Sequence, residues 1–258
     1  MNIKVVSAVF LGCLMAVSSV SAAEWNEHKD VHFIVYYKDA PQDFIKSVEQ
    51  MSENYYHEIA NNLGFTRYKG WLWNKQVIIY IYHDATDYVQ SSQQYQWSHG
   101  AASAKERTIR TFPSAHGFFD STLPHELGHI IFREFIGFQA RIPLWFEEGV
   151  AMYQEKAKRW GAHDAVRQAI EDGNFIPLAE LNKVQLDNNS NPKLVNLFYA
   201  ESASILYYMI HELGEQRFVN FCKKLEAGET FESGLHAVYV RFRNLNDLNK
   251  SWVNYLKR

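Results

Sequence analysis

Hydrophobic and polar positions change their pattern midway along the chain. In the first half, short runs rich in β-branched and aromatic residues predict three strands, over residues 31–37, 76–82 and 108–112. Between them, apolar positions recur at helical spacing over residues 43–63, and a polar segment over residues 84–94 predicts a short helix. The first half is therefore expected to form α/β units around a small sheet.

The second half is almost entirely helical by the same criterion. Helices are predicted over residues 123–135, 143–158, 164–171, 197–213, 216–226, 232–240 and 245–256. Ser121 and Thr122 are candidate N-caps of the first, and Pro143 begins the second. These patterns predict an α+β fold, in which an N-terminal α/β lobe with a small mixed sheet (residues 23–137) precedes a mainly helical lobe (residues 138–258).

The first 22 residues have the layout of a secretory signal peptide. Lys4 precedes an apolar run, and small residues end the segment, so cleavage is expected after Ala22 or Ala23. An uncleaved anchor and a lipoprotein at Cys13 are the alternatives, although the apolar run is short for a membrane span and continues past that cysteine. We expect export to the periplasm or the medium, with no stable membrane anchor after cleavage.

Composition narrows the class of protein further. The 258 residues are 47% hydrophobic and 15% aromatic, which suits a globular protein with an ample core. A formal net charge of -3 offers nucleic acid no electrostatic attraction, so no nucleic-acid partner is expected. Signal cleavage would leave Cys222 as the one cysteine, which excludes an intramolecular disulfide, and its amphipathic surroundings predict a buried thiol.

The sequence His-Glu-Leu-Gly-His at residues 125–129 is the main candidate for chemistry. On the predicted helix, His125 and His129 project from one face and could present two imidazoles to one Zn²⁺ ion. Glu126 could then take the proton from an attacking water without being a ligand. The motif fixes only three positions, so a helix whose polar face carries these groups by coincidence is the alternative.

A third ligand has to come from another element, because a catalytic zinc site uses three protein ligands. The helix that begins at Pro143 contains Glu147 and Glu148, and the turn before it could return this helix beside the first. Gly149 and Ala151 are small enough to let the two helices approach closely. A glutamate of this helix could therefore complete a site of two histidines and one carboxylate.

At this point the chain resembles the peptidase MA-like zinc metallopeptidases of the gluzincin group. Their usual pattern is His-Glu-x-x-His followed by Pro-x-Trp-x-x-Glu-Gly-x-Ala, and residues 143–151 match the second part at every specified position. The resemblance continues more loosely through residues 175–181, 199–204 and Trp252, and so covers most of the mature chain. It implies a zincin-like fold, Glu148 instead of Glu147 as the third zinc ligand, and hydrolysis of a peptide or protein substrate with Glu126 as general base.

The resemblance also implies a side-chain donor for the oxyanion, commonly a tyrosine or histidine in gluzincins. Tyr199, which begins one of the matched segments, is the candidate, and Tyr153, His211 and His236 are alternatives. Glu147 has two interpretations, a hydrogen bond to the free ring nitrogen of a ligand histidine or simple exposure to solvent.

Substrate binding and biological role are less specified. Related enzymes bind extended peptides along an edge strand beside the active helix, and the strand predicted over residues 108–112 is the candidate. Two other functions use the same residues: a metal-dependent amidase or peptidase for cell-wall peptides, and a non-catalytic envelope binding or assembly factor on a gluzincin scaffold. An intact Glu126 argues against the second, because a purely structural zinc site has no use for a base.

Overall fold

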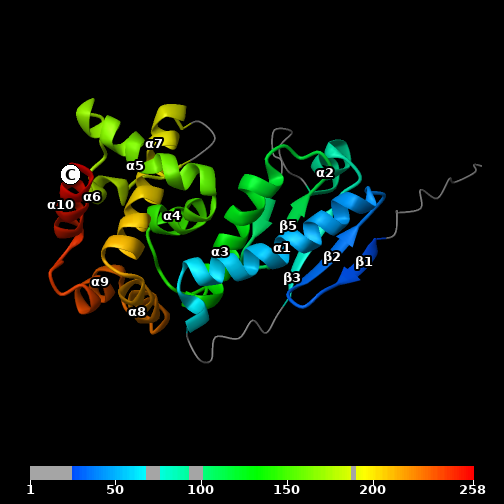
Figure 1. The fold of residues 1–258 in the computed structure, drawn as a ribbon, viewed down its shortest axis with the longest axis horizontal. Helices are drawn as coiled ribbons and strands as arrows, with labels where there is room; N and C mark the ends of the chain where they lie inside the picture. The colour runs from blue at the N-terminus through cyan, green and yellow to red at the C-terminus, as the bar shows by residue number, and fades with distance from the viewer. Residues whose placement is uncertain (1–24, 68–75, 93–100, 187–189) are drawn as a thin grey trace, which may run out of the picture.

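Strands gather in the first part of the chain and helices make up the rest (Figure 1). The computed structural model describes residues 25–67, 76–92, 101–186 and 190–258. The signal peptide predicted over residues 1–22 lies outside these described residues. Among the described helices, none combines the length and the apolar character needed to cross a bilayer.

The sheet has five strands in the order β1-β2-β3-β5-β4. These are β1 (Asn26–Lys29), β2 (Phe33–Tyr37), β3 (Val77–Ile81), β4 (Ala101–Ser103) and β5 (Thr108–Thr111). The β2–β3 and β3–β5 pairs are parallel, whereas β1 and β4 pair antiparallel at the two edges, so the predicted small mixed sheet is confirmed. The prediction that residues 108–112 form an edge strand is wrong, because β4 covers that side of β5.

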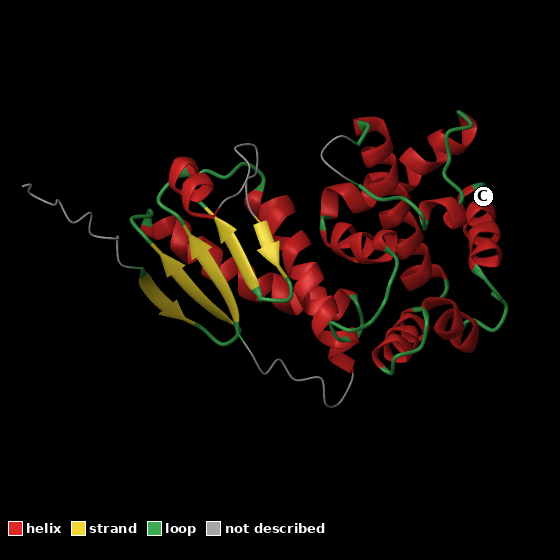
Figure 2. Cartoon of the chain, turned by 180° about the vertical axis from the view of Figure 1, so that it is seen from behind, coloured by secondary structure: helices red, strands yellow, loops and turns green. Residues whose placement is uncertain are grey.

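Two long helices pack against the buried face of this sheet. α1 (Gln42–Asn62) and α3 (Leu123–Ile136) contact one another and lie behind the strands in Figure 2. Alternate residues of the central strands, such as Val77, Ile79 and Ile81, are fully buried. The short elements η1 (Phe65–Arg67), α2 (Ala85–Ser92) and the π-helical turn η2 (Phe118–Thr122) complete this part.

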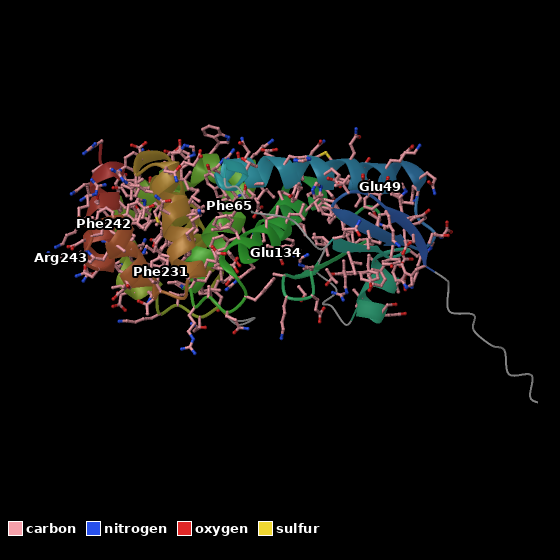
Figure 3. The ribbon with its side chains drawn as sticks, turned by 90° about the horizontal axis from the view of Figure 1, so that it is seen from below. Glu49, Phe65, Glu134, Phe231, Phe242 and Arg243 are labelled. Atoms are coloured by element: carbon pink, nitrogen blue, oxygen red, sulfur yellow. The ribbon has the colours of Figure 1, made fainter. Side chains whose placement is uncertain are left out.

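The remaining chain is helical, which confirms the predicted α+β fold class with its mainly helical C-terminal part. Its elements are α4 (Leu144–Gln154), α5 (Lys156–Glu171), α6 (Leu178–Leu181), α7 (Pro192–Tyr207), the π-helical turn η3 (Tyr208–Glu212), α8 (Glu215–Glu226), α9 (Phe231–Val238) and α10 (Leu245–Leu256). Aromatic rings fill its core, where Phe146 and Phe231 lie edge to face at 5.0 Å. Figure 3 places Phe231 and Phe242 at this helical end and Glu49 at the strand-bearing end.

Two details near the start of α3 and the end of α4 differ from expectation. Neither Ser121 nor Thr122 caps α3, because η2 leads directly into that helix. The helix predicted over residues 143–158 breaks at Glu155, whose backbone is extended between α4 and α5. Both differences bring side chains toward His125 on α3, since Ser121 and Glu155 contact one another and Glu155 contacts His125.

Close contact between α3, α4 and α7 depends on two glycines. A Cβ atom on Gly128 of α3 would lie 3.1 Å from the Cα atom of Ala151 in α4. A Cβ atom on Gly149 of α4 would lie 2.6 Å from the backbone oxygen of Ser202 in α7. Larger residues would push these helices apart, so both glycines set the distance between the elements that carry the candidate site.

We predict that Gly149→Ala destabilises the protein by about 1–3 kcal/mol, because the added methyl group overlaps backbone that cannot move away without shifting a helix. Gly161→Ala in α5 is the matched control, since a Cβ atom there meets nothing within 4 Å. That control should be neutral or stabilising by up to about 1 kcal/mol. Urea unfolding followed by circular dichroism measures both, and equal stabilities of the two variants would contradict the packing argument.

Candidate functional site

α3 places two imidazoles and a carboxylate at the junction of the sheet-bearing and helical parts. His125 and His129 are one turn apart, and their Nε2 atoms lie 3.2 Å from one another. Glu126 follows His125 directly, in the first turn of the same helix. All three side chains are only partly accessible to solvent. The predicted pair of histidines therefore converges on one point.

α4 brings a third donor to this point. The Oε2 atom of Glu148 lies 3.6 Å from Nε2 of His125 and 3.8 Å from Nε2 of His129. Ligand atoms bound tetrahedrally to zinc at roughly 2.0–2.1 Å lie about 3.3 Å from one another. The three atoms are thus spaced as a group that could hold one metal ion, with a side left for a further ligand.

Glu147, the neighbour of Glu148, faces a different partner. Its carboxylate accepts two hydrogen bonds from Arg133 of α3, at 2.6 Å from Nε and 2.5 Å from Nη2. Arg133 also donates to the backbone oxygen of Ala140 in the turn between the helices. Both interpretations of Glu147 are therefore wrong: it neither contacts a histidine of the site nor points freely into solvent, but joins α3 to α4 and so fixes the register that aims Glu148.

Glu155 is a site residue that the sequence did not reveal. Its Oε1 atom lies 2.9 Å from Nδ1 of His125, and its other oxygen accepts a hydrogen bond from Ser121. The Glu155 side chain is almost fully buried, at 2% exposure. A carboxylate on the far nitrogen of a metal-ligating histidine orients the ring and raises its basicity. The break between α4 and α5 makes this contact, and a helical pattern running through residue 158 concealed it.

Burial and charge shift the pKa values of these groups in opposite directions. Burial alone would lower the pKa of His125, but hydrogen bonds to Glu148 and Glu155 raise it to about 9. Burial, assisted by the charge of His125, lowers the pKa of His129 to about 4. Burial and the negative charges of Glu148 and Glu155 raise the pKa of Glu126 against the opposing effect of His125. The protonation of His125, Glu126 and His129 therefore depends on the charges of their neighbours in the site.

Tyr199 of α7 responds to the charges of the same carboxylates. Burial, followed by the negative charges of Glu148, Glu126 and Glu155, raises the pKa of its phenol to about 12. It therefore keeps its proton over the whole physiological range and can act as a hydrogen-bond donor. α7 packs along α4, which carries Glu148 and ends next to Glu155.

The three alternatives to Tyr199 are engaged elsewhere. The Tyr153 hydroxyl lies 2.7 Å from Nε2 of His211, and the ring of His211 stacks on Tyr207. Nδ1 of His236 lies 3.2 Å from the backbone oxygen of Phe242. Burial shifts the pKa values of Tyr199, Tyr153 and His211, and of these three that of Tyr199 is also raised by Glu148 and Glu126.

We predict that Glu155→Gln weakens metal binding at this site about 10- to 100-fold, because a neutral amide supports the imidazole of His125 less well than a carboxylate. Glu171→Gln is the control, since Glu171 is exposed to solvent at the end of α5. Competition with a chromophoric zinc chelator measures both affinities. Equal losses in the two variants would show that Glu155 has no special role.

Comparison with known families identifies the class. The family model of the peptidase MA superfamily matches residues 63–258, a range that contains α3, α4 and α7 and therefore every residue of the site. A search of curated proteins finds no match for the chain. The superfamily consists of peptidases that are typically metal-dependent, in keeping with the group of donors found here. The chain therefore belongs to the peptidase MA superfamily.

Proposed function

We propose that this protein is an exported zinc metallopeptidase of the gluzincin group, which hydrolyses peptide bonds with Glu126 as general base. The observation that carries the proposal is the convergence of Nε2 of His125, Nε2 of His129 and Oε2 of Glu148. Glu126 follows His125 in the first turn of α3 and is not one of these three donors. Peptide hydrolysis needs such a base to accept a proton from water, whereas a purely structural metal site does not.

Zinc fits the donors that the chain offers. Two imidazole nitrogens and one carboxylate oxygen form a common donor set of catalytic zinc sites, and Glu155 supports His125 as such sites require. His125, His129 and Glu148 would hold the ion. When bound, Zn²⁺ supplies a Lewis acid that polarises the scissile carbonyl and makes water acidic enough to be deprotonated near neutral pH.

Glu126 performs the proton transfers in this proposal. Its carboxylate accepts a proton from the attacking water and later delivers it to the nitrogen of the departing amine. The pKa of Glu126 is raised by burial and by Glu148, the direction that brings a carboxylate closer to the pKa of an efficient general base. Tyr199 donates its phenolic proton in a hydrogen bond to the oxygen that becomes negatively charged when the carbonyl is attacked.

The predicted signal peptide supports work outside the cytoplasm, in the periplasm or the medium. The substrate would then be a peptide or protein of that compartment. The cell-wall and binding-factor alternatives use the same metal residues, so a substrate panel has to separate them.

We predict that Glu126→Gln lowers peptide hydrolysis by at least about 100-fold while the protein still binds one Zn²⁺ at the site, because the amide cannot accept the proton. Glu171→Gln, an exposed position at the end of α5, is the control and should keep full activity. Cleavage of a peptide library and metal analysis are measured on the same samples. A zinc-loaded, fully active Glu126→Gln protein would exclude this mechanism.

The same panel should contain purified cell wall beside the peptide library. Release of cell-wall fragments without cleavage of linear peptides would favour the cell-wall hydrolase. Zinc bound by His125, His129 and Glu148 with no cleavage of either substrate, in wild type as in Glu126→Gln, would favour the binding or assembly factor.

We predict that Tyr199→Phe lowers kcat about 10- to 1,000-fold and leaves KM nearly unchanged, because the lost hydrogen bond forms only in the transition state. Tyr207→Phe is the matched control on α7, since Tyr207 stacks on His211 away from the carboxylates. If Tyr199→Phe lowers the melting temperature but leaves kcat unchanged, Tyr199 contributes to packing alone.

A further inference from the structure

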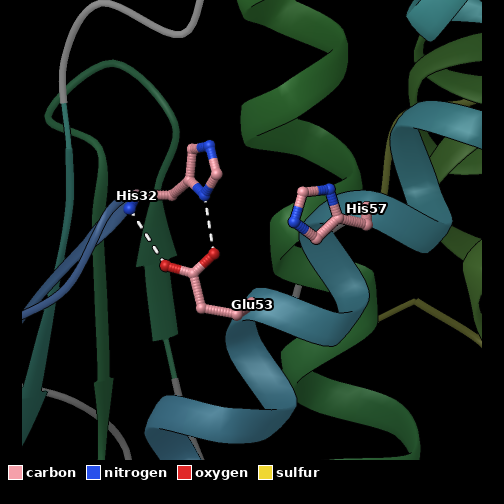
Figure 4. A group of neighbouring side chains, drawn as sticks. All are labelled: His32, Glu53 and His57. Carbon is pink, nitrogen blue, oxygen red and sulfur yellow. Dashed lines mark hydrogen bonds and ion pairs between the residues drawn. The ribbon is translucent and has the colours of Figure 1, made fainter.

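A second group of side chains with potential metal ligands lies where α1 crosses the start of β2. Glu53 and His57 are four residues apart on α1 and so share one face of the helix. His32 stands immediately before β2 and faces them (Figure 4). One ligand atom from each of the three side chains lies within 4.8 Å of the other two.

Two members of this group are already held in place. Nδ1 of His32 lies 2.6 Å from Oε2 of Glu53, and the backbone N–H of His32 donates to the other oxygen at 3.0 Å. The ring of Tyr56 stacks on His32 with centroids 3.7 Å apart, which restrains the imidazole. The rings of His32 and His57 are nearly perpendicular, at 88°. An ion would therefore meet a donor pair that needs little further ordering.

The group is accessible from solvent on one side. The side chains of His32 and Glu53 are 15% and 19% exposed, and His57 is an exposed residue. A metal ion can enter on the His57 side and lie between His32 and Glu53. Coordination to both groups would then replace the hydrogen bond that joins them.

The donor types select the class of ion. Two imidazoles and one carboxylate suit Zn²⁺ and neighbouring divalent transition metals, whereas Mg²⁺ and Ca²⁺ prefer oxygen donors throughout. Further donor residues extend the row, because Glu49 lies one turn before Glu53 and its carboxylate is 3.6 Å from Nδ1 of His28. Asn54, Tyr55 and Tyr56 separate Glu53 from His57, so this segment has no carboxylate in the position that Glu126 takes between the histidines of α3.

The position in the chain separates this group from the site described above. His32, Glu53 and His57 all precede residue 63, where the match to the peptidase superfamily begins. The family match therefore does not account for them. They join the β1–β2 hairpin, at the edge of the sheet, to the helix that packs on it.

We propose that His32, Glu53 and His57 bind a second divalent transition-metal ion, with Zn²⁺ the best match, and that this ion fastens the β1–β2 hairpin to α1. The ion would add a cross-link between an edge strand and the helix beside it. Its binding does not depend on the proposed peptidase activity.

The test is metal stoichiometry of the full chain, stripped of metal and dialysed against excess Zn²⁺, by plasma mass spectrometry. Wild type should bind two ions and His57→Ala one. His129→Ala, which removes a ligand of the first site, should also bind one, and the double variant none. His83→Ala is the matched control, an exposed histidine in the loop after β3, and should keep both ions. Retention of two ions by His57→Ala would overturn the proposal.

A second readout tests the proposed role in the fold. In the His129→Ala background, Zn²⁺ should raise the melting temperature, and the rise should disappear when His57→Ala is added. His57 is exposed, so this substitution does not disturb the core. One ion in wild type that is lost in His129→Ala but kept in His57→Ala would disprove the second site and leave the peptidase proposal intact. One ion in wild type that is lost in His57→Ala but kept in His129→Ala would support the second site and contradict metal binding at the site of the peptidase proposal.

Discussion

The distance between α3 and α4 is the constraint on which the rest of the structure depends. Two of the converging donors belong to α3 and one to α4, so their spacing depends on where one helix lies against the other. Gly128 removes the side chain that would hold the helices apart, and Gly149 does the same between α4 and α7. The Arg133–Glu147 pair then joins the two helices. Close packing and electrostatic attachment together set the geometry of the donors.

Four glutamates lie around this junction, and each has different neighbours and therefore a different role. Glu148 faces both imidazoles, Glu155 holds the far side of His125, and Glu147 pairs with a cation. Burial and the charges of Glu148 and Glu155 raise the pKa of Glu126 against the effect of His125. Burial acts in the same direction on Glu148, but its hydrogen bond to His125 and the charges of both histidines lower its pKa. Identical side chains thus acquire distinct chemistry from burial and neighbours alone.

At the sheet-bearing end, the β1–β2 hairpin also has to be held against a helix, α1. β1 is a short strand with four exposed residues, so it contributes little hydrophobic contact to the fold. His32 and Glu53 supply a polar link between the hairpin and α1, in addition to the apolar contacts of Phe33 and Val35 beneath it. These polar groups therefore attach the hairpin to α1 and are also the donors of the proposed second metal site.

The sequence by itself determined the helical and strand patterns, the α+β class and the identity of the donor types, because periodicity and residue chemistry are local properties. It missed β1 and β4, whose short polar or small-residue segments become strands only by pairing with neighbours. Only the tertiary structure decided that Glu147 pairs with Arg133 and that Glu155 reaches His125. Both contacts depend on where α3, α4 and the break after Gln154 lie in space, and the spacing of residues along one helix carries no information about a partner on another.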